Sequence, residues 1–143
     1  MGYSFLFLCV GNSCRSQMAE AFAKKYATSE VIIQSAGSEP ASQVNPNAIA
    51  VMKEIGLDIA DQRPKLLTHE LKKGVTHYIS MGCGILESCP VPLLGGKVIE
   101  WELEDPVGKD LDFFRKVRDQ IQRNVKGLLS DFNVLKKLKK TVF

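Results

Sequence analysis

The first thirty residues combine a continuous apolar run with a helical spacing of apolar positions. Residues 3–8 are apolar except for one serine, which suits a strand that is buried on both faces. After a polar segment, apolar side chains recur at i, i+3, i+4 and i+7 and predict the buried face of a helix: Ala19, Phe22, Ala23 and Tyr26. The chain therefore begins as strand, loop and helix.

The same two patterns alternate along the rest of the chain. Strands are predicted over residues 31–34, 76–80 and 97–101. Asn45 and Pro46 are typical of a helix start, and Gly56 suits the end of that helix. Its buried face consists of Ala48, Val51, Met52 and Ile55. A long last helix buries Phe114, Val117, Ile121, Val125, Leu128 and Phe132. Alternating strands and helices predict an α/β fold, with a parallel sheet sandwiched between helices.

The composition suits one domain with its own core. The chain has 143 residues, of which 45% are hydrophobic, and we expect a monomer with a single domain over residues 1–143. The formal net charge is only +3. Lysines gather between Lys136 and Lys140, where we expect them at the solvated end of the last helix. No extended basic surface is predicted, which excludes nucleic acid as a partner.

No segment resembles an export signal or a membrane span. The apolar run at residues 3–8 has no basic region before it and is too short to cross a bilayer. We therefore expect a cytoplasmic protein with no membrane partner. In that reducing compartment the four cysteines serve chemistry or metal binding rather than structural disulfides.

A cysteine, five residues and an arginine lie between the first strand and the first helix. Ligands of parallel sheets bind just beyond the strand ends, and a helix start offers unpaired amide hydrogens to an anion. The spacing therefore predicts a loop that wraps a tetrahedral oxyanion. Its oxyanion-binding residues are predicted to be Val10, Gly11, Asn12, Ser13, Cys14, Arg15 and Ser16.

Cys9 is the candidate nucleophile of this loop. The planar fork of Arg15 can hold two oxyanion oxygens, and the positive field around it favours a Cys9 thiolate at neutral pH. Ser16 can donate a hydrogen bond to that thiolate. The ordinary alternative, a buried cysteine followed by an unrelated arginine, does not explain why strand, glycine, helix start, arginine and serine occur in this order. The spacing fits neither a Walker loop nor a dinucleotide-binding fingerprint.

At these residues the chain resembles the low-molecular-weight protein tyrosine phosphatases and their relatives, the thioredoxin-coupled arsenate reductases. The resemblance covers nearly the whole chain and is carried by residues 9–16, 17–21, 35–37 and 104–106. It implies the fold of that family. We therefore expect a three-layer sandwich whose four-stranded parallel sheet has the strand order 2-1-3-4.

Asp105 is the candidate general acid. It follows the last predicted strand and precedes Pro106, which restrains the backbone so that the carboxyl group can be aimed from a loop. Taken alone, the pair reads more simply as a turn before a helix. The resemblance implies that Asp105 donates a proton to the leaving oxygen.

Two further cysteines bear on the choice between phosphatase and reductase. Cys9, Arg15 and Asp105 suffice for hydrolysis of a phosphate ester, whereas reduction of arsenate needs two electrons. An enzyme without a cofactor draws them from thiols, and Cys83 and Cys89 lie in a glycine-rich segment that lets them move. We therefore expect an arsenate reductase that binds phosphate or sulfate as analogues and uses a Cys9, Cys83 and Cys89 disulfide relay. The resemblance implies thioredoxin as the electron donor.

Three alternatives stay open. A low-molecular-weight protein tyrosine phosphatase would use the same nucleophile, arginine and acid, although residues 107–109 lack the two tyrosines that such phosphatases commonly carry there. A non-enzymatic oxyanion or redox sensor is a second. Third, Cys83 and Cys89 could be incidental thiols, or could bind zinc together with Cys9 and Cys14. Five residues lie between Cys83 and Cys89 where the reductases usually have six, which is a departure from the loop geometry of that family. The same spacing is wide for zinc, and we expect no metal site.

The remaining cysteine and the histidines have weaker interpretations. Cys14 could form a disulfide with Cys9 under oxidative stress, but a passive loop residue is the simpler reading. His69 and His77 have no recognisable ligand pattern around them, so we assign them no catalytic role.

The resemblance also concerns a cation. Some reductases of this family hold a potassium ion with an asparagine, a glutamate, a serine and an aspartate, and the first three are matched by Asn12, Glu20 and Ser35. The position of the aspartate is Lys65, whose ammonium could stand where the cation would. We therefore expect activity that does not depend on potassium.

Overall fold

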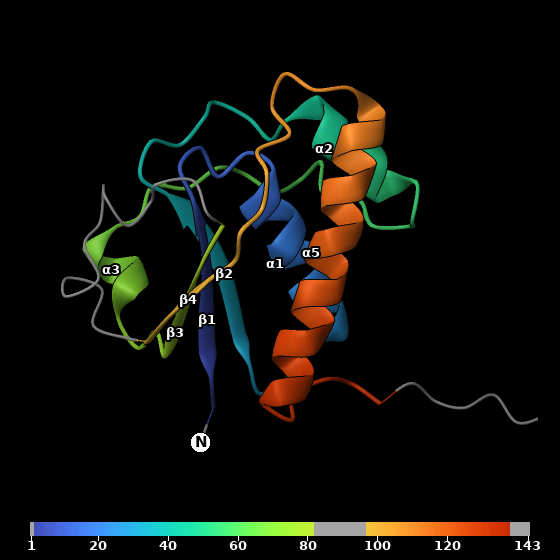
Figure 1. Ribbon diagram of the computed structural model, residues 1–143. Coiled ribbons are helices and arrows are strands. Elements are labelled where there is room, and N and C mark those ends of the chain that lie inside the picture. The colour runs from blue at the N-terminus through green and yellow to red at the C-terminus, as the bar shows by residue number, and fades with distance from the viewer. Residues whose placement is uncertain (1, 82–96, 138–143) are drawn as a thin grey trace, which may run out of the picture.

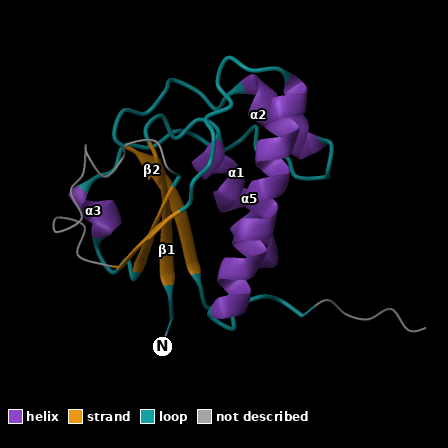
Figure 2. Ribbon diagram, in the orientation of Figure 1, coloured by secondary structure: helices purple, strands orange, loops and turns teal. Residues whose placement is uncertain are grey.

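The computed structural model describes residues 2–81 and 97–137, and these form three layers (Figures 1 and 2). The central layer is a four-stranded parallel sheet in the order β2-β1-β3-β4, as predicted. Its strands are β1 (Ser4–Cys9), β2 (Ile32–Gly37), β3 (His77–Ser80) and β4 (Lys97–Glu100). One face is covered by α1 (Arg15–Tyr26), α2 (Pro46–Lys53) and α5 (Leu111–Asp131), and the other by the short α3 (His69–Lys72).

The position of β1 follows from its sequence. All six of its side chains are buried, and they alternate between the two faces of the sheet. Phe5 and Phe7 pack in the larger core under α1 and α5, whereas Leu6 and Leu8 pack in the smaller core on the α3 side. Because β1 lies between β2 and β3, its last residue reaches the carboxyl edge of the sheet at its centre.

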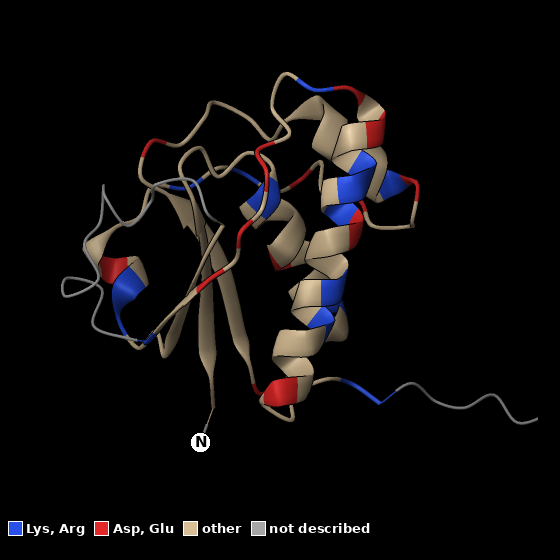
Figure 3. Cartoon of the chain, viewed as in Figure 1, with Lys and Arg blue, Asp and Glu red and all other residues tan. Residues whose placement is uncertain are grey.

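The helices follow the predicted apolar stripes. In α5 the buried side chains include Phe114, Val117, Ile121, Val125 and Leu128. Asp110 caps its first turn by accepting a hydrogen bond from the amide of Phe113 at 2.9 Å. Charged residues recur along α5 between its buried apolar positions (Figure 3). None of the described helices is long and apolar enough to span a membrane.

Two details differ from the sequence-based expectations. The helix α3 was not predicted, because it has only four residues and buries none of them. Lys136 and Lys137, the described part of the lysine run, do not form a helix end, which corrects the expectation for these two residues. The helix ends at Asp131, Asn133 adopts the left-handed conformation, and the amide of Lys136 pairs with the carbonyl of Tyr26.

His77 predicts how stability depends on pH. Its side chain is buried against the rings of Phe5 and Phe132, and burial, helped by the charge of Lys97, lowers its pKa below the ordinary 6.5. As the pH falls, His77 therefore takes up a proton in the unfolded chain at a higher pH than in the folded chain. The contribution of His77 to stability is therefore complete above about pH 6.5 and is lost as the pH falls below it.

When the pH is lowered from 7.5 to 5.5, we expect the free energy of unfolding to fall less in His77→Phe than in the parent protein. Urea unfolding at the two pH values measures the change in the free energy of unfolding. An equal loss in both proteins would show that His77 does not contribute to the acid sensitivity.

Candidate active site

The loop after β1 lies against the segment that follows β2. Three backbone amides of that segment donate hydrogen bonds of 2.9 Å to carbonyl oxygens of the loop: Glu39 to Val10, Ala41 to Gly11 and Asn45 to Ser13. In a trans peptide the carbonyl and the following N–H point in opposite directions. The loop amides that follow these carbonyls therefore face away from the segment, toward the space in front of Cys9.

Gly37 makes this close approach possible. It is the last residue of β2 and pairs with Cys9 across the sheet. A Cβ at this position would overlap the carbonyl oxygens of Val10 and Cys9 and would lie 3.0 Å from the amide nitrogen of Asn12. The glycine in residues 35–37 is therefore required by the path of the loop.

The sulfur of Cys9 has two close polar neighbours. The amide of Asn12 donates to Sγ at 3.2 Å, and the hydroxyl of Ser16 lies 2.8 Å from it. The direction of the second bond follows from the side chain of Asn12. Its Oδ1 accepts from the amide of Lys65 at 2.8 Å, so its Nδ2 donates to Ser16 at 2.7 Å. The hydroxyl hydrogen of Ser16 is then left for the sulfur, so both neighbours donate to Sγ.

Arg15 is held by the backbone on both sides of the site. Its guanidinium is almost fully buried, and Nη1 donates to the carbonyls of Met81 at 3.0 Å and Leu103 at 3.1 Å. Met81 directly follows β3, and Leu103 lies in the segment between β4 and α5. Two carbonyls therefore fix the guanidinium plane, and its remaining donors are directed toward the site.

Asp105 faces the loop from the opposite side. Its Oδ1 accepts a hydrogen bond from the amide of Val107 at 3.1 Å, and its Oδ2 lies 3.6 Å from Nη2 of Arg15. The side chain is 57% exposed, so protons can exchange with solvent. The turn after Pro106 thus orients the carboxyl group toward the arginine.

These residues surround one cavity of about 320 Å³, whose described lining is Cys9, Val10, Gly11, Ser13, Cys14, Arg15, Asp105 and Val107. The sequence-predicted nucleophile, oxyanion loop and acid are therefore brought together, with Asn12 and Ser16 directly behind the sulfur. None of the described lining residues is aromatic. Cys83 and Cys89, predicted as relay cysteines, lie outside the described residues.

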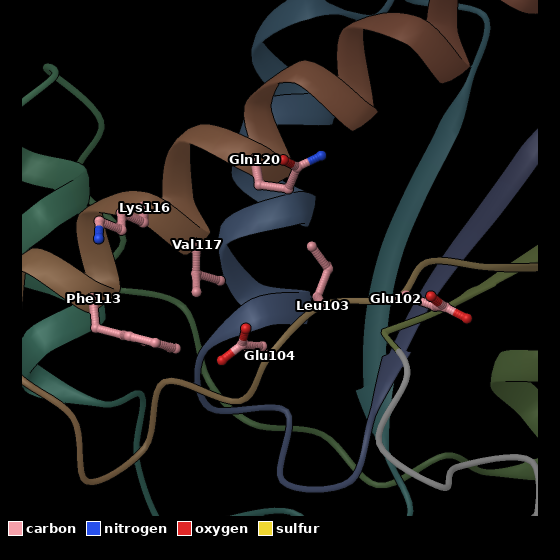
Figure 4. Close-up of a pocket in the computed structure, with 7 residues that line it drawn as sticks. All are labelled: Glu102, Leu103, Glu104, Phe113, Lys116, Val117 and Gln120. Atoms are coloured by element: carbon pink, nitrogen blue, oxygen red, sulfur yellow. The ribbon is translucent and has the colours of Figure 1, made fainter.

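A second cavity lies on the other side of the segment that carries Asp105. It measures about 260 Å³, and Figure 4 shows the side chains that line it: Glu102, Leu103, Glu104, Phe113, Lys116, Val117 and Gln120. It contains no residue with a predicted role. Leu103 separates the two cavities, because its carbonyl binds Arg15 while its side chain lines the second one.

Cys14 has a different environment from Cys9. Burial is the main cause that raises the pKa of its thiol to about 12, and the nearby Cys9 adds to the shift. It also stands at the N-cap of α1 without a side-chain capping bond. At neutral pH Cys14 remains a thiol, which makes it a poor nucleophile.

Glu20, Ser35 and Lys65 meet behind the loop. Ser35 donates to Oε1 of Glu20, and Nζ of Lys65 lies 3.5 Å from the same oxygen. Burial of Glu20 acts to raise its pKa, but Lys24, Ser35 and Lys65 outweigh it, so the pKa lies below its usual value. Lysine ammonium groups thus already neutralise this carboxylate, which weakens its attraction for an additional cation.

Sequence reasoning missed two features of this site. The carbonyls of Met81 and Leu103 are backbone groups that come from distant segments, and no residue type marks them. Gln17 was noted only as part of a motif. Its burial among apolar neighbours in α1 is the signal that could have identified it, because a buried amide needs partners.

Comparison with known proteins agrees with this arrangement. The family model described as low molecular weight phosphotyrosine protein phosphatase matches residues 4–142. The chain belongs to this family. Among its relatives, an arsenate reductase of Brevibacillus brevis is 41% identical over 84% of this chain and 89% of its own length. A glutaredoxin arsenate reductase of Synechocystis is 39% identical over 87% of this chain and 95% of its own length.

Solved structures of the family extend the comparison. An arsenate reductase in the phosphate binding state has a TM-score of 0.77 and 36% identity, covering 90% of this chain and 98% of that one. A thioredoxin-dependent arsenate reductase of Corynebacterium glutamicum has a TM-score of 0.77 and 35% identity, covering 92% of this chain and 62% of that one. The phosphatase family therefore includes reductases that are similar to this chain.

The contact between Lys65 and Glu20 predicts that turnover does not depend on potassium. Exchanging potassium for a large inert cation at constant ionic strength should leave the steady-state rate unchanged, because Lys65 already supplies the positive charge. A large loss of rate on removing potassium would contradict this assignment. In Lys65→Met, which lacks the ammonium, we expect a lower rate in either salt.

Proposed function

We propose that this chain is an arsenate reductase in which Cys9 is the nucleophile. The observation that carries the proposal is the cavity in which the Cys9 sulfur, the inward-facing loop amides, Arg15 and Asp105 converge. Its described lining has no aromatic side chain to stack on a phenyl ring, which suits a small inorganic oxyanion. The identity to arsenate reductases over most of the chain supports the same assignment.

The first step forms a bond between sulfur and arsenic. The loop amides and Arg15 hold the oxygens of arsenate, and the Cys9 thiolate attacks the arsenic atom. The arsenic–oxygen bond opposite breaks, and Asp105 gives its proton so that the oxygen leaves as water. The hydrogen bonds that Asn12 and Ser16 donate to the sulfur orient it for the attack.

The second step supplies the two electrons. The Cys83 thiolate attacks the Cys9 sulfur, the sulfur–arsenic bond breaks, and its electron pair remains on arsenic, which leaves as arsenite. Cys89 then attacks Cys83 and frees Cys9, so the oxidised product is a Cys83–Cys89 disulfide. The carbonyl of Met81 contacts Arg15. Cys83 follows Met81 by two residues in the sequence.

Thioredoxin is our proposed electron donor. A disulfide between Cys83 and Cys89 can be reduced by a dithiol protein through a mixed disulfide, whereas a glutaredoxin route requires a glutathione adduct. Both kinds of name occur among the relatives, one thioredoxin-dependent and one glutaredoxin arsenate reductase. We also propose the cytoplasm as the compartment, because reduced thiols persist there.

Hydrolysis of phosphotyrosine is the second candidate function. It is favoured by the family to which the chain belongs, and Cys9, Arg15 and Asp105 suffice for it. It needs no second or third cysteine, so it does not account for Cys83 and Cys89.

One assay separates these functions. Purified protein with arsenate, thioredoxin, thioredoxin reductase and NADPH should oxidise NADPH in proportion to arsenate. Replacing the thioredoxin pair by glutaredoxin, glutathione and glutathione reductase should support a lower rate of NADPH oxidation. Hydrolysis of an aryl phosphate without arsenate-dependent oxidation would contradict the reductase and support the phosphatase. Oxyanion binding with neither activity would indicate a sensor.

Asp105→Asn should slow formation of the arsenic adduct by about a hundredfold, because an amide cannot give a proton to the leaving oxygen. Phosphate binding should change little in this variant. Arg15→Ala should instead weaken phosphate binding, since it removes the buried guanidinium. Rapid-quench kinetics and competition by phosphate measure the two effects, and full activity of Asp105→Asn at every pH would exclude it as the acid.

Cys89→Ser should release about one arsenite per enzyme and stop with a disulfide between Cys9 and Cys83, because the last thiol of the relay is missing. Cys83→Ser should stop earlier, before arsenite is released. Peptide mass mapping after one turnover identifies the disulfide. Finding Cys9 bonded to Cys14, with Cys83 still a free thiol in Cys89→Ser, would refute the relay.

A further inference from the structure

Gln17 is a buried amide in the first turn of α1, directly behind the oxyanion loop. Its side chain has no exposed surface, yet all of its polar atoms have partners. Nε2 lies 2.9 Å from the carbonyl of Asn12, 3.0 Å from Oδ1 of Asn12 and 2.9 Å from the carbonyl of Arg63. Oε1 accepts from Nε2 of Gln62 at 2.6 Å.

The orientation of this amide follows from its partners. Two of the atoms around Nε2 are backbone carbonyls, which only accept hydrogen bonds. The third, Oδ1 of Asn12, is identified as an acceptor by the amide of Lys65 that donates to it. The group facing Asn12 is therefore the NH₂ end of Gln17, and its oxygen faces Gln62.

Gln17 completes the outward row of carbonyls on which the loop depends. The carbonyls of Val10, Gly11 and Ser13 are held by backbone amides of the segment after β2. The carbonyl of Asn12, in the same row, is held by the side chain of Gln17. Because the peptide is trans, turning this carbonyl outward directs the amide of Ser13 toward the bound oxyanion.

The same contacts act on the nucleophile. Asn12 has a φ of +47°, a left-handed conformation that needs local support in a residue other than glycine. Its Nδ2 donates to Ser16, which in turn lies beside the Cys9 sulfur. Holding both the carbonyl and the side-chain oxygen of Asn12 therefore fixes the backbone amide that donates to the Cys9 sulfur and the side chain that positions Ser16.

We propose that Gln17 is a positioning residue, which sets the Asn12 peptide and side chain and thereby both the reactivity of Cys9 and the affinity of the loop for a tetrahedral oxyanion. It rests on the proposed function only in taking Cys9 as the nucleophile. The alternative is a purely structural role, in which Gln17 joins α1 to residues 62–65 and affects only the stability of the protein.

The test reads Cys9 and the loop without arsenate turnover. Gln17→Met keeps the length of the side chain and removes its hydrogen bonds. It is made in a background with Cys83→Ser and Cys89→Ser, so that Cys9 is the reactive thiol that iodoacetamide alkylates. Gln122→Met is the matched control, because Gln122 donates only to the hydroxyl of Tyr26, on the far part of α1.

We expect Gln17→Met to slow alkylation of Cys9 at pH 6.5 by about three- to tenfold and to raise the phosphate concentration that half-protects Cys9 by about tenfold. The control should change neither value by more than about twofold, within the range of surface substitutions. A Gln17→Met protein with a lower Tm but an unchanged alkylation rate and unchanged phosphate protection would overturn the proposal. It would show that Gln17 has a structural role only.

Two further variants keep the test decisive if Gln17→Met does not fold. Gln17→Glu places a carboxylate against three acceptor oxygens, so only the protonated form of this side chain can donate a hydrogen bond. Protection of Cys9 by phosphate should therefore weaken in this variant, relative to the parent, as the pH rises from 5 to 7.

Gln62→Met keeps the hydrogen bonds that Gln17 donates but removes the one that its Oε1 accepts. This variant should slow alkylation of Cys9 about two- to threefold. Parent-like values in both would contradict the proposal. Failure of the parent protein to reduce arsenate would count against the proposed function alone.

Discussion

The carbonyl oxygens of the loop after β1 must point away from the site if the loop amides are to face a bound oxyanion. Each outward carbonyl turns the next amide inward, and a row of inward amides is what binds a tetrahedral oxyanion in front of Cys9. The segment after β2 supplies three of the donors that hold this row. Gly37 is required because any larger residue would collide with the loop that it supports.

The sheet and the helices serve the same geometry. The complete burial of β1 places Cys9 at the centre of the carboxyl edge, where loops from neighbouring strands can reach it. Arg15 connects these loops, since one nitrogen binds the backbone after β3 and the backbone before Asp105. A change in either segment would therefore move the arginine and the acid relative to the sulfur.

Local patterns in the sequence predicted much of this arrangement. The apolar run of β1, the stripe of α5 and the spacing from Cys9 to Arg15 are short-range signals, and the strand order followed from the family resemblance. The helix end before the lysines was predicted wrongly, because the charge pattern does not show that the chain leaves the helix at Asn133 to pair with α1. The bonds of Gln17 to Asn12 and Arg63 could not be predicted, since they depend on how distant segments pack.

We propose that Cys9 starts a reduction of arsenate whose two electrons come from the thiols of this chain. The most direct measurement mixes the fully reduced protein with arsenate in the absence of any external reductant, then counts arsenite released and thiols lost. We expect about one arsenite released and two thiols lost per chain, and neither with Cys9→Ser. Arsenite formation by Cys9→Ser, or phosphate-like binding of arsenate with every thiol retained in the parent protein, would contradict it.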